Sequence, residues 1–142
     1  MVKAEVNTFI KAPVNKVWEV LNDTERLPEW MPLLEDINDI QGEGVGSTFN
    51  WKYKFLGIKF KGSSKIEEQE AGKKHVMKSK AGIESIWTWN FTPEGDGTKV
   101  NLNVEYTIPV PVLGKYAEKY VVKQGKRDME YLMDNFKHFL EG

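Results

Sequence analysis

The chain has 142 residues, of which 40% are hydrophobic and 29% charged, with a formal net charge of −1. This size and balance are typical of one globular domain, residues 1–142, and exclude a disordered chain. The near-neutral charge argues against a nucleic-acid partner. The absence of cysteine excludes disulfides, thiolate metal sites and cysteine nucleophiles. Without an apolar run of about 20 residues or a signal-peptide pattern, we expect a cytoplasmic protein with no stable membrane insertion.

The first elements are predicted to be one strand followed by two short helices. Residues 2–11 alternate between apolar and polar side chains, as in a half-buried strand. Pro13 then precedes apolar residues at helical spacing in 14–21, which predicts a short helix. Residues 24–32 are too rich in proline for a long helix, so a single helical turn is expected there.

Six further strands are predicted between residues 37 and 108. The clearest alternation lies in 49–55. We expect 49–55, 87–91 and 100–108 to be antiparallel strands with their bulky residues facing the C-terminal helix. Gly62 is predicted to form a bulge. The glycines in 42–46 lack the lysine and Ser/Thr of a nucleotide-binding loop and are predicted to form a turn.

The last predicted element is a helix from Leu113 to Leu140, about 40 Å long. Its apolar residues recur at helical spacing and include Tyr116 and Tyr120, while Gly125 should weaken or bend it. A long amphipathic helix after a run of strands can bury its apolar face against the concave side of a curved sheet. The sequence therefore predicts an α+β fold in which a sheet wraps around a helix, with room for a cavity between them.

Large side chains with polar groups gather on the predicted inner faces. They either fill the core or line a cavity for an apolar ligand, because buried tryptophan N–H and tyrosine O–H groups need partners. On the second interpretation, the ligand-binding residues are Trp51, Tyr53, Phe60, His75, Met77, Trp87, Trp89, Tyr106, Tyr120 and Gln124.

His75 is the candidate general acid or base, although a lone inward histidine is more often a hydrogen-bonded core residue. No serine lies in a nucleophile-elbow sequence. The other histidine, His138, is far away in the predicted helix, so we expect neither a metal site nor a cofactor.

Several segments, in this order, resemble the helix-grip superfamily, which includes START domains, birch-pollen-allergen relatives, and polyketide cyclase/dehydrase and lipid-transport proteins. The segments are Ala12-Pro13-Val14-x-x-Val17-Trp18, Leu27–Pro32, Gly44–Ser47, Pro93–Thr98 and the terminal helix. The resemblance implies a seven-stranded antiparallel sheet gripping the C-terminal helix, with two short helices after the first strand. It also implies a cavity for a hydrophobic small molecule.

Three functions remain open from the sequence. The leading hypothesis is binding or transport of a lipid, polyketide or aromatic metabolite, because the inner faces are bulky and carry few ionisable groups. The alternative is a polyketide cyclase or dehydratase, in which His75 with Tyr53 or Tyr106 would supply acid–base chemistry. A protein-interaction module is the third hypothesis, and it requires a large exposed apolar patch. The oligomeric state is left open.

Overall fold

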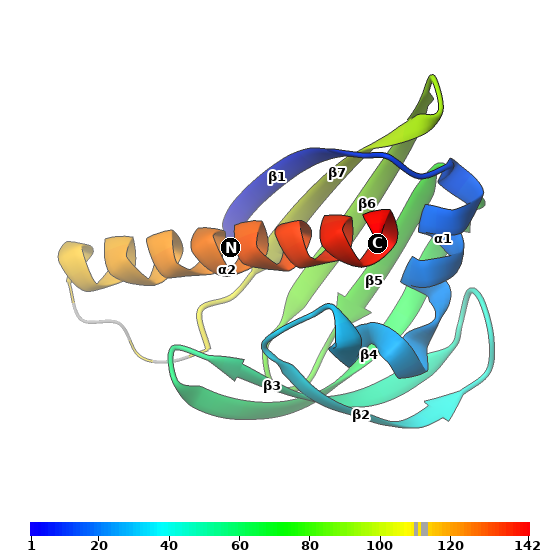
Figure 1. Ribbon diagram of the computed structural model, residues 1–142. Coiled ribbons are helices and arrows are strands. Elements are labelled where there is room, and N and C mark those ends of the chain that lie inside the picture. The colour runs from blue at the N-terminus through cyan, green and yellow to red at the C-terminus, as the bar shows by residue number, and fades with distance from the viewer. Residues whose placement is uncertain (110, 112–113) are drawn as a thin grey trace.

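The computed structural model describes residues 1–109, 111 and 114–142 (Figure 1). In chain order its elements are β1 (Val2–Ile10), α1 (Val14–Asn22), the 3₁₀ helix η1 (Thr24–Glu29), β2 (Leu34–Gln41), β3 (Thr48–Phe55), β4 (Ile58–Glu70), β5 (Lys74–Ser79), β6 (Ser85–Glu94), β7 (Gly97–Tyr106) and α2 (Lys115–Glu141). This is the predicted order of one strand, two short helices, six strands and a long helix. None of the helices in the described residues is long and apolar enough to cross a lipid bilayer.

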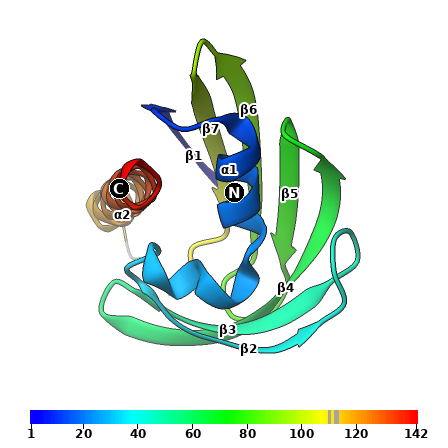
Figure 2. The ribbon, with the colours of Figure 1, turned by 45° about the vertical axis from the view of Figure 1, so that its right-hand side comes forward.

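The strands form a seven-stranded antiparallel sheet in the order β1-β7-β6-β5-β4-β3-β2. Successive strands from β2 to β7 are neighbours, and β1 closes the order by pairing with β7, Val2 opposite Tyr106. Figure 2 shows the sheet curling around α1 and η1, with α2 beside β1. The curved antiparallel sheet and terminal helix predicted from the alternation are confirmed.

The predicted inner faces of β3, β6 and β7 are also confirmed. On β3, Phe49, Trp51 and Phe55 are buried, whereas Lys52 and Lys54 are exposed. A shift of one residue in register would have reversed this pattern, because successive side chains of a strand point to opposite faces.

Helix α2 is partly different from the prediction. It runs unbroken from Lys115 through Gly125 to Glu141, and the predicted start at Leu113 lies outside the described residues. Its buried face begins only at Val121, and Tyr120 is 65% exposed. The predicted apolar face therefore does not include the first turns, because that end of α2 projects past the sheet (Figure 1) and has no surface to pack against.

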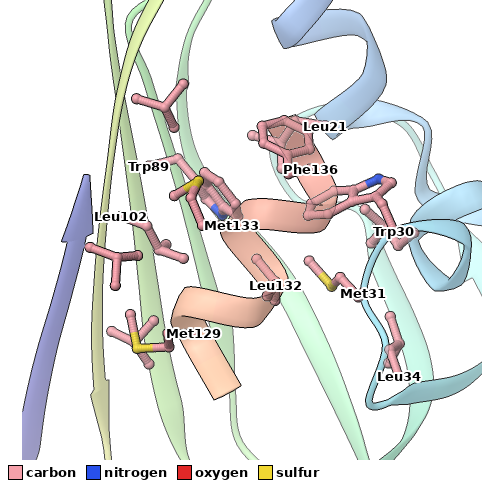
Figure 3. Close-up of a cluster of buried hydrophobic side chains, with 14 of the residues drawn as sticks. Leu21, Trp30, Met31, Leu34, Trp89, Leu102, Met129, Leu132, Met133 and Phe136 are labelled. Atoms are coloured by element: carbon pink, nitrogen blue, oxygen red, sulfur yellow. The ribbon is translucent and has the colours of Figure 1, made fainter. Parts of the chain in front are cut away.

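The centre of the core joins α2 to the sheet and to η1. Phe136 of α2 lies 4.2 Å from the Trp30 ring and 5.4 Å from the Trp89 ring, measured between centroids. Trp30 and Trp89 meet edge to face at 6.0 Å. Leu21 of α1 and Leu132 of α2 complete this cluster, which Figure 3 shows filling the space between helix and sheet. This end of the molecule is solidly packed.

Candidate functional site

At the other end of the concave face, a cavity of about 100 Å³ lies between the sheet and the middle of α2. Its walls come from the inner faces of β3 to β7, from η1 and β2, and from one turn of α2. The lining residues are Leu27, Met31, Leu34, Phe49, Trp51, Tyr53, Phe55, Ser64, Met77, Ser79, Ile83, Ser85, Trp87, Val104, Tyr106, Gly125, Asp128 and Met129. The lining is therefore mostly aromatic and aliphatic, with a few hydroxyls and one carboxyl group.

Strands β5, β6 and β7 each contribute one end of their inner face to the cavity and the other end to the packed core, whereas the whole inner face of β3 lines the cavity. On β6, Ser85 and Trp87 line the cavity, whereas Trp89 and Phe91 are buried and stack on each other at 6.4 Å. The division on β5 is similar, and His75 falls on the packed side. Period-two alternation predicts the face of a strand but not which end of that face remains open.

The structure brings five of the ten predicted ligand-binding residues to the cavity: Trp51, Tyr53, Met77, Trp87 and Tyr106. The other five lie elsewhere. Phe60 is half-buried against the core, and Trp89 is in the aromatic cluster, where it is 1% exposed. Tyr120 faces solvent, and Gln124 contacts the cavity only through Asp128.

His75 lies under α1 rather than in the cavity. Its ring meets Trp18 edge to face at 6.0 Å, and Gln69 Nε2 lies 3.1 Å from His75 Nδ1. Gln69 also donates to the Asn22 side chain, which itself donates to the Trp18 carbonyl. Burial lowers the pKa of His75 to about 4. A neutral imidazole that accepts a hydrogen bond from Gln69 ties α1 to β4 and β5, which is a structural role.

The two indoles of the cavity wall have their N–H groups satisfied by serines. Trp51 Nε1 donates to Ser64 Oγ at 2.9 Å, and Trp87 Nε1 donates to Ser85 Oγ at 3.2 Å. The edge of Trp51 also lies against Gly62, where an added Cβ would come within 2.3 Å of the ring. The predicted bulge at Gly62 is wrong, because this residue pairs in register with Trp51. Glycine is needed here for close approach.

The polar part of the cavity is formed by Tyr53, Tyr106 and Asp128. Tyr106 is 7% exposed, and its hydroxyl has no hydrogen-bond partner. Asp128 Oδ1 accepts a hydrogen bond of 3.0 Å from Gln124 Nε2. Burial raises the pKa of Asp128, an effect that the Gln124 hydrogen bond opposes. Burial is the main cause of a raised pKa at both tyrosines, and the negative charge of Asp128 adds to it. Tyr53, Tyr106 and Asp128 therefore each keep their proton to a higher pH than they would in water.

Sequence reasoning missed Asp128, although a signal was present. Asp128 falls on the same helical face as Val121, Gly125 and Leu132, all of which are buried. A carboxylate that interrupts an apolar helix face requires an explanation, since burying an unpaired charge is costly. In the described part of the chain, no three metal-ligating side chains gather to hold an ion.

Comparison with known proteins places this architecture in a family. The model of the family described as polyketide cyclase / dehydrase and lipid transport matches residues 1–141. The chain belongs to this family. A comparison with curated proteins gives no match.

Several solved structures share the fold of this chain. The crystal structure of TTHA0849 from Thermus thermophilus has a TM-score of 0.85 at 24% identity, covering 96% of this chain and 95% of that one. A START superfamily protein from Mycobacterium smegmatis has a TM-score of 0.82 at 14% identity, covering 98% and 97%. The Zhui aromatase/cyclase from Streptomyces sp. R1128 also scores 0.82, at 16% identity, covering 99% and 93%. At these identities the likeness shows the helix-grip fold.

Proposed function

We propose that this protein binds an apolar, ring-containing small molecule in the cavity between the sheet and α2, as a carrier or receptor. The observation that carries the proposal is the composition of the cavity wall: indole, phenol and aliphatic side chains surround a few polar groups. This is the composition of small-molecule sites, where apolar surface provides affinity and sparse polar groups fix orientation. The proposed ligand-binding residues include Trp51, Trp87 and Tyr106. Membership in a family described by polyketide chemistry and lipid transport agrees with such a ligand.

The volume of the cavity limits the size of the ligand that it can enclose. At about 100 Å³ it is somewhat smaller than the apolar cavity of about 150 Å³ that holds one benzene molecule in an engineered protein. A single aromatic ring therefore fits with small side-chain adjustments, whereas a lipid chain or a multi-ring polyketide exceeds this volume.

The direct test is a two-dimensional NMR titration with toluene. Binding in the cavity should shift the amide signals of β3, β6 and the middle of α2 saturably, and leave those near α1 unchanged. Val104→Phe should abolish binding by filling the cavity, because Val104 lines it. Ile86→Phe, on the opposite face of the neighbouring strand, is the matched control and should bind normally. Absence of saturable shifts would show that the cavity is only a packing defect.

A cyclase or dehydratase is the second candidate, because Asp128 combines a raised pKa with two nearby phenols inside the cavity. A carboxylate whose pKa is shifted upward is better suited to proton transfer near neutral pH. This chemistry would use Asp128 and Tyr106, and His75 would have no part in it. Turnover of a polyketide-like substrate that disappears in Asp128→Asn, while binding persists, would favour the enzyme.

A further inference from the structure

We propose that the cavity selects ligands that carry a primary ammonium group, which pairs with the Asp128 carboxylate and donates to the Tyr106 hydroxyl. This inference rests on the proposed function and adds the chemical class of the ligand. It follows from the polar groups that the cavity leaves without partners.

The first observation is the orphaned Tyr106 hydroxyl. Among the described residues, two buried side-chain polar atoms have no hydrogen-bond partner, Trp30 Nε1 and Tyr106 Oη, and of these residues only Tyr106 lines the cavity. The hydroxyl points at Gly125, since a Cβ built there would lie 2.6 Å from it. A buried hydroxyl without a partner is unfavourable, so a ligand atom that completes its hydrogen bonding would gain affinity.

The second observation is that Asp128 lacks a countercharge. Within the described residues, no lysine, arginine or histidine lies at ion-pair distance from its carboxylate. Gln124 occupies one oxygen, Oδ1, as a neutral donor. The carboxylate therefore retains unused acceptor capacity next to the cavity, and a carboxylate accepts hydrogen bonds most strongly from a cationic donor.

The walls favour the same ligand chemistry. Trp51, Tyr53 and Trp87 line the cavity. Aromatic rings of this kind attract a cation and pack against an attached ring. An anionic ligand, by contrast, would meet the negative charge of Asp128. A protonated amine brings a positive charge to Asp128 and has a further N–H donor for the Tyr106 hydroxyl, whereas an alcohol can hydrogen-bond to both groups but carries no charge.

The test compares three probes that share one ring: toluene, benzyl alcohol and benzylamine. Dissociation constants come from NMR titrations near pH 7, where benzylamine is protonated. We expect benzylamine to bind about tenfold or more tightly than benzyl alcohol, the range for a hydrogen bond to a charged group. Asp128→Asn should reduce that preference to less than about twofold, and Tyr106→Phe should reduce it several-fold.

Asp134→Asn is the matched control, because it removes the same charge from an exposed position of the same helix. Asp134→Asn should retain the full preference for benzylamine over benzyl alcohol. This result would distinguish a local contact with Asp128 from a general effect of the protein's net charge. Equal affinities for benzylamine and benzyl alcohol in the native protein would overturn the inference and leave the proposed function standing. An undiminished preference in Asp128→Asn would overturn it too. If none of the three probes binds, both proposals fall.

Discussion

Acidification should destabilise this fold through one buried imidazole. Burial lowers the pKa of His75 to about 4 in the folded protein. The unfolded chain binds the same proton with a pKa of about 6.5. Because the unfolded state then holds more protons, stability falls as the pH drops below about 6.5, and the loss is complete below about 4. Linkage gives a loss of about 2 kcal/mol between pH 7 and pH 5 and about 3 kcal/mol at pH 4.

The surroundings of His75 explain why protonation is unfavourable. Its side chain is 4% exposed, and no acidic group contributes to the shift of its pKa. Nδ1 accepts a hydrogen bond from the Gln69 amide, so a proton on that nitrogen would replace an attraction with a clash between two donors.

The assay is urea unfolding at pH 7 and pH 5 for three proteins. The native chain should lose about 2 kcal/mol between these values. His75→Gln should cost about 1–2 kcal/mol at pH 7, the scale of one hydrogen bond, and should lack most of the further loss at pH 5. His138→Gln, in the exposed part of α2, is the control and should keep the native pH dependence. Asp128 has a raised pKa and acts in the opposite direction, but it cancels in the comparison between variants. An equal acid-induced loss in His75→Gln would refute the reasoning.

Two further predictions concern the division between core and cavity. Trp89→Ala should cost about 3–5 kcal/mol, since the ring is fully buried, whereas Trp87→Ala should cost less and weaken toluene binding more. Equal stability losses measured by urea unfolding would contradict this division. Gly125→Ala should destabilise the native chain, because the new Cβ would lie 2.6 Å from the Tyr106 hydroxyl. In a Tyr106→Phe background the same change should be neutral or stabilise by up to about 1 kcal/mol, because alanine favours the helix. A double-mutant cycle without coupling would show that this contact does not explain the glycine.

The fold was predictable because it depends on local pattern. The alternation in β3, β6 and β7 identifies the apolar face of each strand, and the helical spacing in α2 identifies the apolar face of the helix. A curved sheet packed against that helix buries all of these faces. The matching pattern of buried and exposed residues on β3 follows from that requirement. The same logic identified Trp51, Trp87 and Tyr106 as inward-facing residues, and all three line the cavity.

The position of a residue along an inner face depended on tertiary structure. His75 and Met77 share one face of β5, yet α1 covers the first and the cavity borders the second. Tyr120 has the spacing of a core residue, but α2 extends beyond the sheet and leaves it in solvent. Neither outcome is encoded in local periodicity, because both depend on where the sheet ends and on which helix crosses it.

The polar part of the cavity is the clearest example of a feature that the sequence pattern does not predict. In the sequence, Asp128 is one of 21 acidic residues, and nothing local connects it to tyrosines on β3 and β7. By itself the sequence determined the curved sheet, the long helix and the aromatic inner face, since these follow from periodic burial. Only the tertiary structure decided that a carboxylate and an orphaned phenol share one cavity, because the packing of α2 against the curved sheet brings together residues that are distant in the chain.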